Sequence, residues 1–113
     1  MTTTTKIAKK FLKNPSHIEA VQFDGTESSM YPGVTFRYDD IWFVYNESTD
    51  SWITIDVMKD PKEYTDNFWY IYNKLHDSWI KIKIGDYYRV DIEGDNYPID
   101  QEYMKENYTE VEE

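Results

Sequence analysis

The sequence predicts a mainly β fold, with α+β as the alternative class: a small antiparallel sheet or open barrel of roughly six to seven short strands with a short C-terminal helix. Three observations support this prediction. Aromatic residues make up 18% of the 113 residues, and their rings pack well on the pleated surface of strands. Short runs of alternating polar and apolar residues are separated by turn residues. A segment typical of a β-hairpin occurs twice, so antiparallel pairing is expected.

The chain has the length of one domain with a single modest core. Residues 1–14 are expected to be a basic lead-in, disordered or partly helical. This segment has no acidic residue and four basic ones, Lys6, Lys9, Lys10 and Lys13. Asn14–Pro15 breaks the pattern. We therefore expect a single β-rich domain over residues 15–113.

The first half of this domain contains two runs with strand-like alternation. Residues 17–23 (HIEAVQF) predict a strand that ends at Asp24–Gly25. Residues 34–38 predict a second strand, which ends at a turn at Asp39–Asp40. The residues between the two strands are polar and include Pro and Gly, so we expect a loop there.

The most informative feature is an internal repeat. Residues 41–57 (IWFVYNESTDSWITIDV) align with residues 68–84 (FWYIYNKLHDSWIKIKI) at an offset of 27 positions, and eight of the 17 aligned pairs are identical. Each copy consists of a strand, a polar four-residue connection and a second strand. This pattern predicts two β-hairpins.

Hairpin geometry then assigns side chains to faces. With residues 47–50 as the loop, Tyr45 lies opposite Trp52 and Phe43 opposite Thr54, and successive side chains alternate between faces. One face is apolar in both copies, and we expect it to be the core face: Trp42, Val44, Ile53, Ile55 and Val57 in the first copy, and Trp69, Ile71, Ile80, Ile82 and Ile84 in the second. The other face mixes rings with polar groups, as a partly solvated sheet face does.

The segments around the repeat complete the prediction. Residues 58–67 are polar and have room for one helical turn starting at Pro61. After the repeat, Gly85–Asp86 predicts a turn and residues 87–93 predict a strand. Residues 100–107 predict a short helix with Asp100 as its N-cap, and residues 109–111 a closing strand.

Two regions near the ends of the chain have distinctive patterns. Residues 13–25 (KNPSHIEAVQFDG) combine a basic residue, a Pro and an IEAVQ-type strand, and they resemble the opening of a widespread family of small uncharacterised bacteriophage and prophage proteins. Residues 82–87 (IKIGDY) resemble its "V-K-V-G-D-W" turn. Residues 94–99 (GDNYPI), with Glu102, Tyr103 and Tyr108 after them, resemble its "G-E-F-Y-P" segment and closing helix.

This resemblance covers about 40 residues at the two ends and excludes the hairpin repeat. Asn14 stands where the family has a second basic residue, and Gln101 stands where the closing helix has a Pro. The resemblance implies a phage origin and expression inside a bacterial host. It implies no particular activity.

Charge and cysteine content limit the function classes. The net charge is −10, and nine acids lie from Asp91 onward against the single base Lys105. Such a surface repels nucleic acid and anionic membranes, so we expect neither to be a direct partner. The chain has no Cys, no apolar run long enough for a membrane span and no apolar signal-peptide core. We therefore expect it in the cytoplasm of the bacterial host.

Catalytic and metal-binding patterns are weak. The chain has two histidines, His17 and His76, and we expect both at the surface. Asp91, Glu93 and Asp95 have the oxygen ligands that Ca²⁺ takes, but they lack the EF-hand spacing. We therefore expect no enzyme activity, no cofactor and no metal site.

The candidate partner-binding residues are the recurring rings of the partly polar face and the acids after the last long strand: Tyr45, Trp52, Tyr72, Trp79, Asp91, Glu93 and Asp95. Tyr and Trp are enriched at binding hot spots. The leading hypothesis is a phage accessory protein that binds a host or phage protein, in the form of an acidic inhibitor of a nucleic-acid-binding or defence protein. The alternative is a phage structural or assembly protein that self-associates. The sequence leaves open the partner, the oligomeric state and whether another segment covers the aromatic face.

Overall fold

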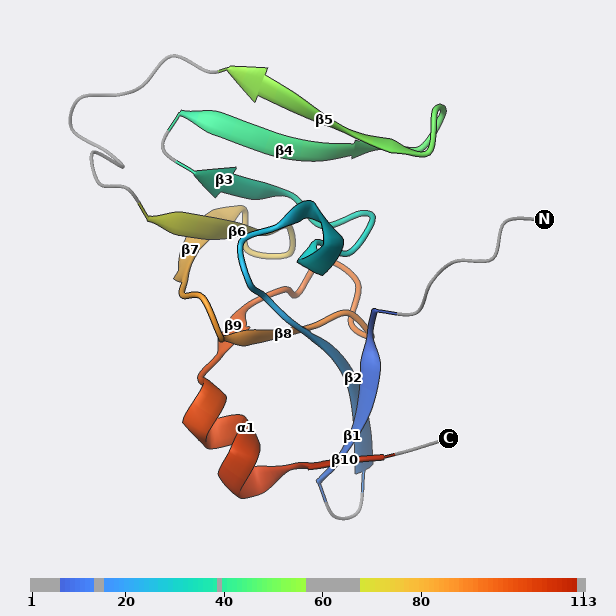
Figure 1. The fold of residues 1–113 in the computed structure, drawn as a ribbon, viewed down its shortest axis with the longest axis vertical. Coiled ribbons are helices and arrows are strands. Elements are labelled where there is room, and N and C mark those ends of the chain that lie inside the picture. The colour runs from blue at the N-terminus through green and yellow to red at the C-terminus, as the bar shows by residue number, and fades with distance from the viewer. Residues whose placement is uncertain (1–6, 14–15, 39, 57–67, 112–113) are drawn as a thin grey trace.

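The computed structural model describes residues 7–13, 16–38, 40–56 and 68–111 (Figure 1). These residues form ten strands in two five-stranded sheets, with one short 3-10 turn, η1 (Glu27–Ser29), and one α-helix. All the described strand pairs are antiparallel, which confirms the mainly β prediction. The strands outnumber those expected because several are only two or three residues long.

The first sheet has the order β10-β1-β2-β8-β9. Its strands are β1 (Lys9–Lys13), β2 (Ser16–Gln22), β8 (Tyr87–Arg89), β9 (Pro98–Ile99) and β10 (Thr109–Glu110). β1 falls where a disordered or helical lead-in was expected. Phe11, opposite Ile18 of β2, is only 6% exposed and anchors this lysine-rich strand to the sheet.

The second sheet has the order β5-β4-β3-β6-β7. Its strands are β3 (Phe36–Tyr38), β4 (Ile41–Asn46), β5 (Ser51–Asp56), β6 (Trp69–Asn73) and β7 (Ser78–Ile82). The predicted hairpins are therefore β4–β5 and β6–β7, and β3 lies between them. The helical turn expected at Pro61 lies outside the described residues.

The C-terminal helix α1 (Gln101–Asn107) follows the sequence prediction closely. Asp100 is its N-cap, and the side-chain Oδ2 accepts hydrogen bonds from the backbone N–H groups of Glu102 (2.9 Å) and Tyr103 (3.3 Å). These bonds satisfy two donors that have no partner inside the helix. Met104 of α1 is 2% exposed and packs in a small cluster with Phe11, Ile18, Ala20 and Ile99.

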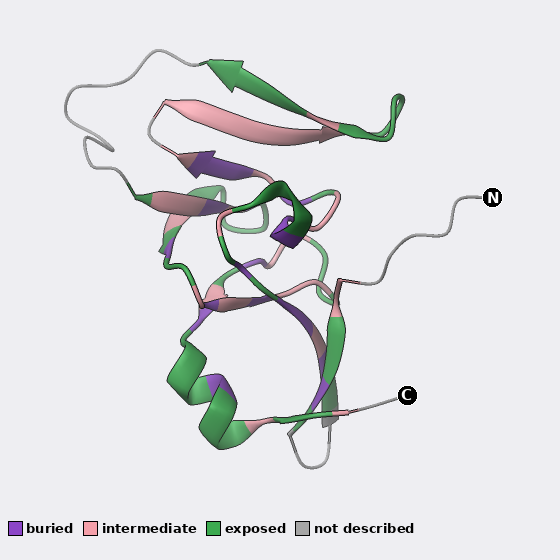
Figure 2. Cartoon of the chain, viewed as in Figure 1, coloured by how far each residue is buried: buried purple, intermediate pink, exposed green. Residues whose placement is uncertain are grey.

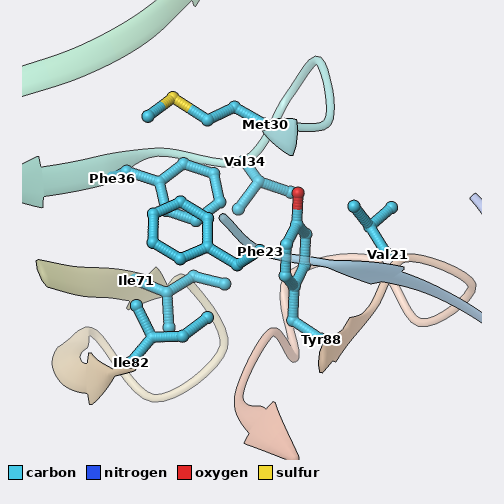
Figure 3. Close-up of a cluster of buried hydrophobic side chains, with 8 residues drawn as sticks. All are labelled: Val21, Phe23, Met30, Val34, Phe36, Ile71, Ile82 and Tyr88. Atoms are coloured by element: carbon cyan, nitrogen blue, oxygen red, sulfur yellow. The ribbon is translucent and has the colours of Figure 1, made fainter. Parts of the chain in front are cut away.

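The main core lies where the two sheets meet (Figure 3). It consists of Val21, Phe23, Met30, Val34, Phe36, Ile71, Ile82 and Tyr88. Phe23 and Phe36 stack with their ring centroids 5.1 Å apart. The buried hydroxyl of Tyr88 donates to the Ser29 carbonyl (2.7 Å) and accepts from the Tyr31 N–H (2.9 Å), so it ties the loop around η1 to β8. Burial raises the pKa of this hydroxyl far above its ordinary value.

The internal register of both hairpins agrees with the prediction. Tyr45 lies opposite Trp52 in the first hairpin, and Tyr72 lies opposite Trp79 in the second. The turns also match: Asp50 and Asp77, which occupy equivalent positions, have positive φ values of 55° and 50°. Asp adopts this left-handed conformation more readily than most residues, which gives a physical reason for its presence in both copies.

The two hairpins nevertheless present equivalent residues on opposite faces of the second sheet. Phe36 of β3 lies opposite both Phe43 of β4 and Ile71 of β6, which are 28 positions apart. The repeat offset is 27 positions, so equivalent residues differ by one place in their register against β3. A shift of one place moves every side chain of a strand to the other face. The prediction that one face carries the core residues of both copies is therefore wrong.

The chain path explains this reversal. β4 and β6 both run antiparallel to β3 and therefore in the same direction, but β5 and β7 flank them on opposite sides (Figure 1). Chain direction and the side on which the partner strand lies together fix the face to which each side chain points. Two identical hairpins on opposite sides of β3 are related by a half-turn about the strand direction, which exchanges the faces.

The exposed fractions of equivalent isoleucines in the two hairpins show the effect of this reversal. In the second hairpin the predicted core face is correct, since Ile71 and Ile82 are 0% and 2% exposed. In the first hairpin the equivalent face is turned away from the core, and Ile53 and Ile55 are 40% and 41% exposed. Figure 2 shows β5 mostly exposed along its length. Ile84 was also expected in the core but is exposed beyond the end of β7, and Val57 lies outside the described residues.

Candidate interaction surface

The face of the second sheet turned away from the core is rich in aromatic and aliphatic side chains. We call it the outer face. The strand pairings assign to it Arg37, Trp42, Val44, Ile53, Ile55, Tyr70, Tyr72, Trp79 and Lys81. None of these nine residues is acidic, although the chain has a net charge of −10. The outer face therefore differs in character from the acidic remainder of the sequence.

Three rings from both copies of the repeat meet on the outer face. The Trp79 ring centroid lies 5.2 Å from that of Trp42 and 5.0 Å from that of Tyr72. Trp42 belongs to the first hairpin, whereas Tyr72 and Trp79 belong to the second. The contact therefore crosses the sheet and joins the two hairpins into one aromatic surface, with all three rings partly exposed.

Two nitrogen-bearing groups of this ring cluster are buried. The guanidinium carbon of Arg37, a residue only 6% exposed, is 6.0 Å from the Trp79 ring centroid, at the outer limit of a cation–π contact. The indole Nε1 of Trp42 is buried and has no hydrogen-bond partner within the described part of the chain. A buried N–H without an acceptor is costly and uncommon in folded proteins.

A second cation–aromatic contact borders the outer face. The Lys81 Nζ lies 3.6 Å from the ring centroid of Phe68, which immediately precedes β6 and is 41% exposed. The Lys81 ammonium group thus lies over an exposed ring at the border of the outer face.

The four predicted aromatic candidates are divided between the two faces. Tyr72 and Trp79 lie on the outer face. Tyr45 and Trp52 lie on the opposite face as an edge-to-face pair with centroids 5.4 Å apart, and Trp52 packs against the main core. The expectation that all four lie on one face outside the core is therefore wrong, for the same reason that the core faces of the two hairpins differ.

The predicted acidic candidates lie in the loop that follows β8, and two of them have local partners. Both carboxylate oxygens of Asp91 accept hydrogen bonds from Arg89, at 2.9 and 2.8 Å. Burial favours a higher pKa for Asp91, but the hydrogen bonds and positive charge of Arg89, together with backbone hydrogen bonds, outweigh it and hold the pKa below its ordinary value. Asp95 Oδ1 accepts from the Asn73 side chain at 3.1 Å and lies 3.8 Å from His76 Nε2.

This acidic loop supports the second hairpin. The backbone N–H of Leu75 donates to the Gly94 carbonyl at 2.8 Å, and the side chain of Asn73 donates to the Asn96 carbonyl at 3.0 Å. Glu93 is exposed and helps to line a hollow of about 390 Å³, together with Tyr72 and Lys74 of the second hairpin. Of the predicted candidates, the structure thus brings Glu93 and Tyr72 to the same hollow.

Sequence reasoning missed five outer-face residues: Arg37, Trp42, Val44, Ile53 and Ile55. The last four were expected in the core, and Arg37 had no assigned role. The repeat itself carries no signal of this reversal, which follows from the pairing of β3 with both hairpins.

Comparison of the chain with known proteins assigns it to no family. No family model, curated protein or solved structure matches the chain. Within the described ranges, no three His, Cys, Asp or Glu side chains are grouped so as to hold a metal ion. No helix in that part of the chain is long and apolar enough to cross a bilayer. The function is therefore inferred from the surface.

Proposed function

We propose that this chain is a bacteriophage-encoded accessory protein that acts by binding another protein through its outer face. The observation that carries the proposal is the cluster of Trp42, Tyr72 and Trp79 on a face whose strand residues include no acid. Trp, Tyr and Arg are the residue types most enriched at binding hot spots. The phage origin rests on the resemblance of the two end segments to a phage family.

The charge outside the outer face favours a basic partner. Nine acids lie from Asp91 onward, and such a field attracts positively charged surfaces. A nucleic-acid-binding or defence protein of the bacterial host has this character, and its inhibition is the role we propose. The place of action is the host cytoplasm.

The test is an affinity capture of the tagged chain from host lysate, read by mass spectrometry at low and high salt. Trp79→Ala removes the centre of the aromatic cluster, and Phe68→Ala removes an exposed ring at its border with little risk to folding. Tyr103→Ala, which removes a ring 45% exposed on α1, is the matched control. We expect Trp79→Ala to weaken partner binding by about tenfold or more, a typical hot-spot loss.

A captured protein that binds Trp79→Ala, Phe68→Ala and Tyr103→Ala as tightly as the parent chain contradicts the proposal. A basic partner is also expected to bind less tightly at high salt, because salt screens exposed charges. A second candidate function, self-association in phage assembly, is favoured by a different feature, the edge of the second sheet.

A further inference from the structure

β5 is the one long sheet edge among the described strands that lacks the usual protection against pairing with another chain. Sheet edges are commonly blocked by short length, Lys or Pro. β9 and β10 are two residues long, β9 begins with Pro98, and β7 carries Lys81. β5 has six residues (SWITID), no Lys and no Pro.

β5 is also regular enough to act as a template. It pairs with β4 over six consecutive positions without a bulge, so its outer edge continues the same ladder. All its residues except Trp52 are exposed, and two of them are the outer-face isoleucines Ile53 and Ile55. A regular edge of β-branched residues is the kind of surface to which another strand adds.

We propose that β5 pairs antiparallel with β5 of a second copy of this chain. A two-fold axis perpendicular to the sheet, passing at Thr54, places Ile53 opposite Ile55 of the other copy and Ile55 opposite its Ile53. Each edge then satisfies the backbone groups of the other, as an isologous contact requires. The product is a ten-stranded sheet whose two outer faces join into one continuous surface.

Charge is compatible with this register. Pairing centred on Thr54 sets Asp56, the one acid of β5, opposite Trp52 of the other copy, so no two acids of the paired strands lie opposite each other. Like charges directly opposite each other would be destabilising. The Thr54-centred register therefore joins the two isoleucine pairs without acid–acid repulsion between the strands.

The net charge of −10 gives this association a characteristic salt dependence. The two copies repel each other at long range, and salt shortens the range of that repulsion to about 10 Å at 0.1 M. Burial of the isoleucines is not screened. Self-association is therefore expected to strengthen as salt is added, whereas binding to a basic partner weakens. The two proposals do not depend on each other, and their tests separate them.

The first experiment uses the absence of Cys from the chain. Thr54→Cys places a single thiol beside its own copy on the axis, where opposed Cβ atoms are about 4.5–5.5 Å apart. Ser48→Cys, in the exposed loop of the same hairpin, is the matched control. Under mild oxidation we expect a covalent dimer of Thr54→Cys at several times the yield of Ser48→Cys. Equal yields overturn the proposal.

The second experiment is sedimentation velocity over a concentration series at low and high salt. Thr54→Glu brings its carboxylate and that of Asp56 from both copies together at the axis, and we expect it to weaken association about tenfold or more. Thr54→Gln and Ser48→Glu are the controls and should associate like the parent chain.

A parent chain that stays monomeric at all concentrations and at both salt levels overturns the proposal. So does a Thr54→Glu variant that associates normally. If Thr54→Glu instead loses only a captured lysate protein, the edge binds a strand of a different chain.

Discussion

The two hairpins of the second sheet are copies of one repeated motif but have different environments. In the second hairpin, Ile82 is 2% exposed and lies in the main core, whereas its counterpart in the first hairpin, Ile55, is 41% exposed on the outer face. The difference does not come from the residues, which are identical. It comes from the position of β3 between the hairpins, which forces equivalent side chains onto opposite faces.

Because of this arrangement, the apolar face of the repeated hairpin lies in a different place in each copy. The apolar face of the second copy builds the core, and the apolar face of the first copy contributes to the outer face. Because the reversal follows from topology alone, equivalent substitutions in the two hairpins are matched experiments. They change the same residue type in the same local structure but in different surroundings.

The largest expected difference is between Ile82→Ala and Ile55→Ala. Ile82 is fully enclosed, so its truncation removes buried contacts and leaves a cavity, at a cost of about 2–5 kcal/mol of unfolding free energy. Ile55 is already partly solvated, so the same change should cost less than about 1 kcal/mol. Urea denaturation of both variants measures the difference. Equal losses would show that the two faces are equally buried and that the assigned reversal is wrong.

The second comparison concerns Asn73 and Asn46, which start the two hairpin loops. The Asn46 oxygen accepts one backbone hydrogen bond, from Ser48. Asn73 is 1% exposed, accepts from His76 and donates to Asp95 and to the Asn96 carbonyl. We expect Asn73→Ala to destabilise the protein by about 1–3 kcal/mol more than Asn46→Ala, because it leaves buried partners unsatisfied.

Thermal or chemical unfolding of these two variants and of Asn73→Asp would test this expectation. Asn73→Asp keeps the acceptor but replaces the donor, and it sets a carboxylate beside Asp95. We therefore expect Asn73→Asp to lose at least as much unfolding free energy as Asn73→Ala. If Asn73→Ala and Asn46→Ala unfold alike, the acidic loop does not support the second hairpin.

How much of this could be predicted depended on the range of the interactions involved. The loops, the internal register of both hairpins and the Asp100 cap were predictable because neighbouring residues determine them. The relative orientation of the hairpins was not, because it depends on β3 pairing with strands on both sides. The strand β1 was missed because Phe11 is the one deeply buried side chain among its residues 9–12 and lies in a lysine-rich segment.

The candidate site followed the same division. Tyr72 and Trp79 were correctly placed outside the core because the second hairpin has the expected orientation. Tyr45 and Trp52 were misplaced because the first hairpin is reversed. The acids were identified by composition, which shows charge but not the Arg89 and Asn73 contacts that hold Asp91 and Asp95 in place.

A third comparison is expected to give equal results. The Tyr45–Trp52 and Tyr72–Trp79 pairs have similar centroid distances, 5.4 and 5.0 Å, although they lie on opposite faces. Double-mutant cycles to Ala should give about 0.5–1.5 kcal/mol of coupling energy for each pair. A double-mutant cycle cancels the energy that each ring gains from its other neighbours, such as the core around Trp52 and the Trp42 ring beside Trp79. A coupling energy found in one pair alone would show that the environment, not the hairpin, sets the ring geometry.

The smallest expected effect belongs to His76→Thr, which gives the second loop the residue that the first loop has at Thr49. The His76–Asp95 contact is 3.8 Å long and the histidine side chain is 67% exposed, so water screens the pair. Its loss should change the unfolding free energy by less than about 0.5 kcal/mol. Asp95→Ala should cost more, because Asp95 also accepts the Asn73 hydrogen bond. Equal losses in the two variants would assign the stabilising role of Asp95 to the histidine and not to the buried asparagine.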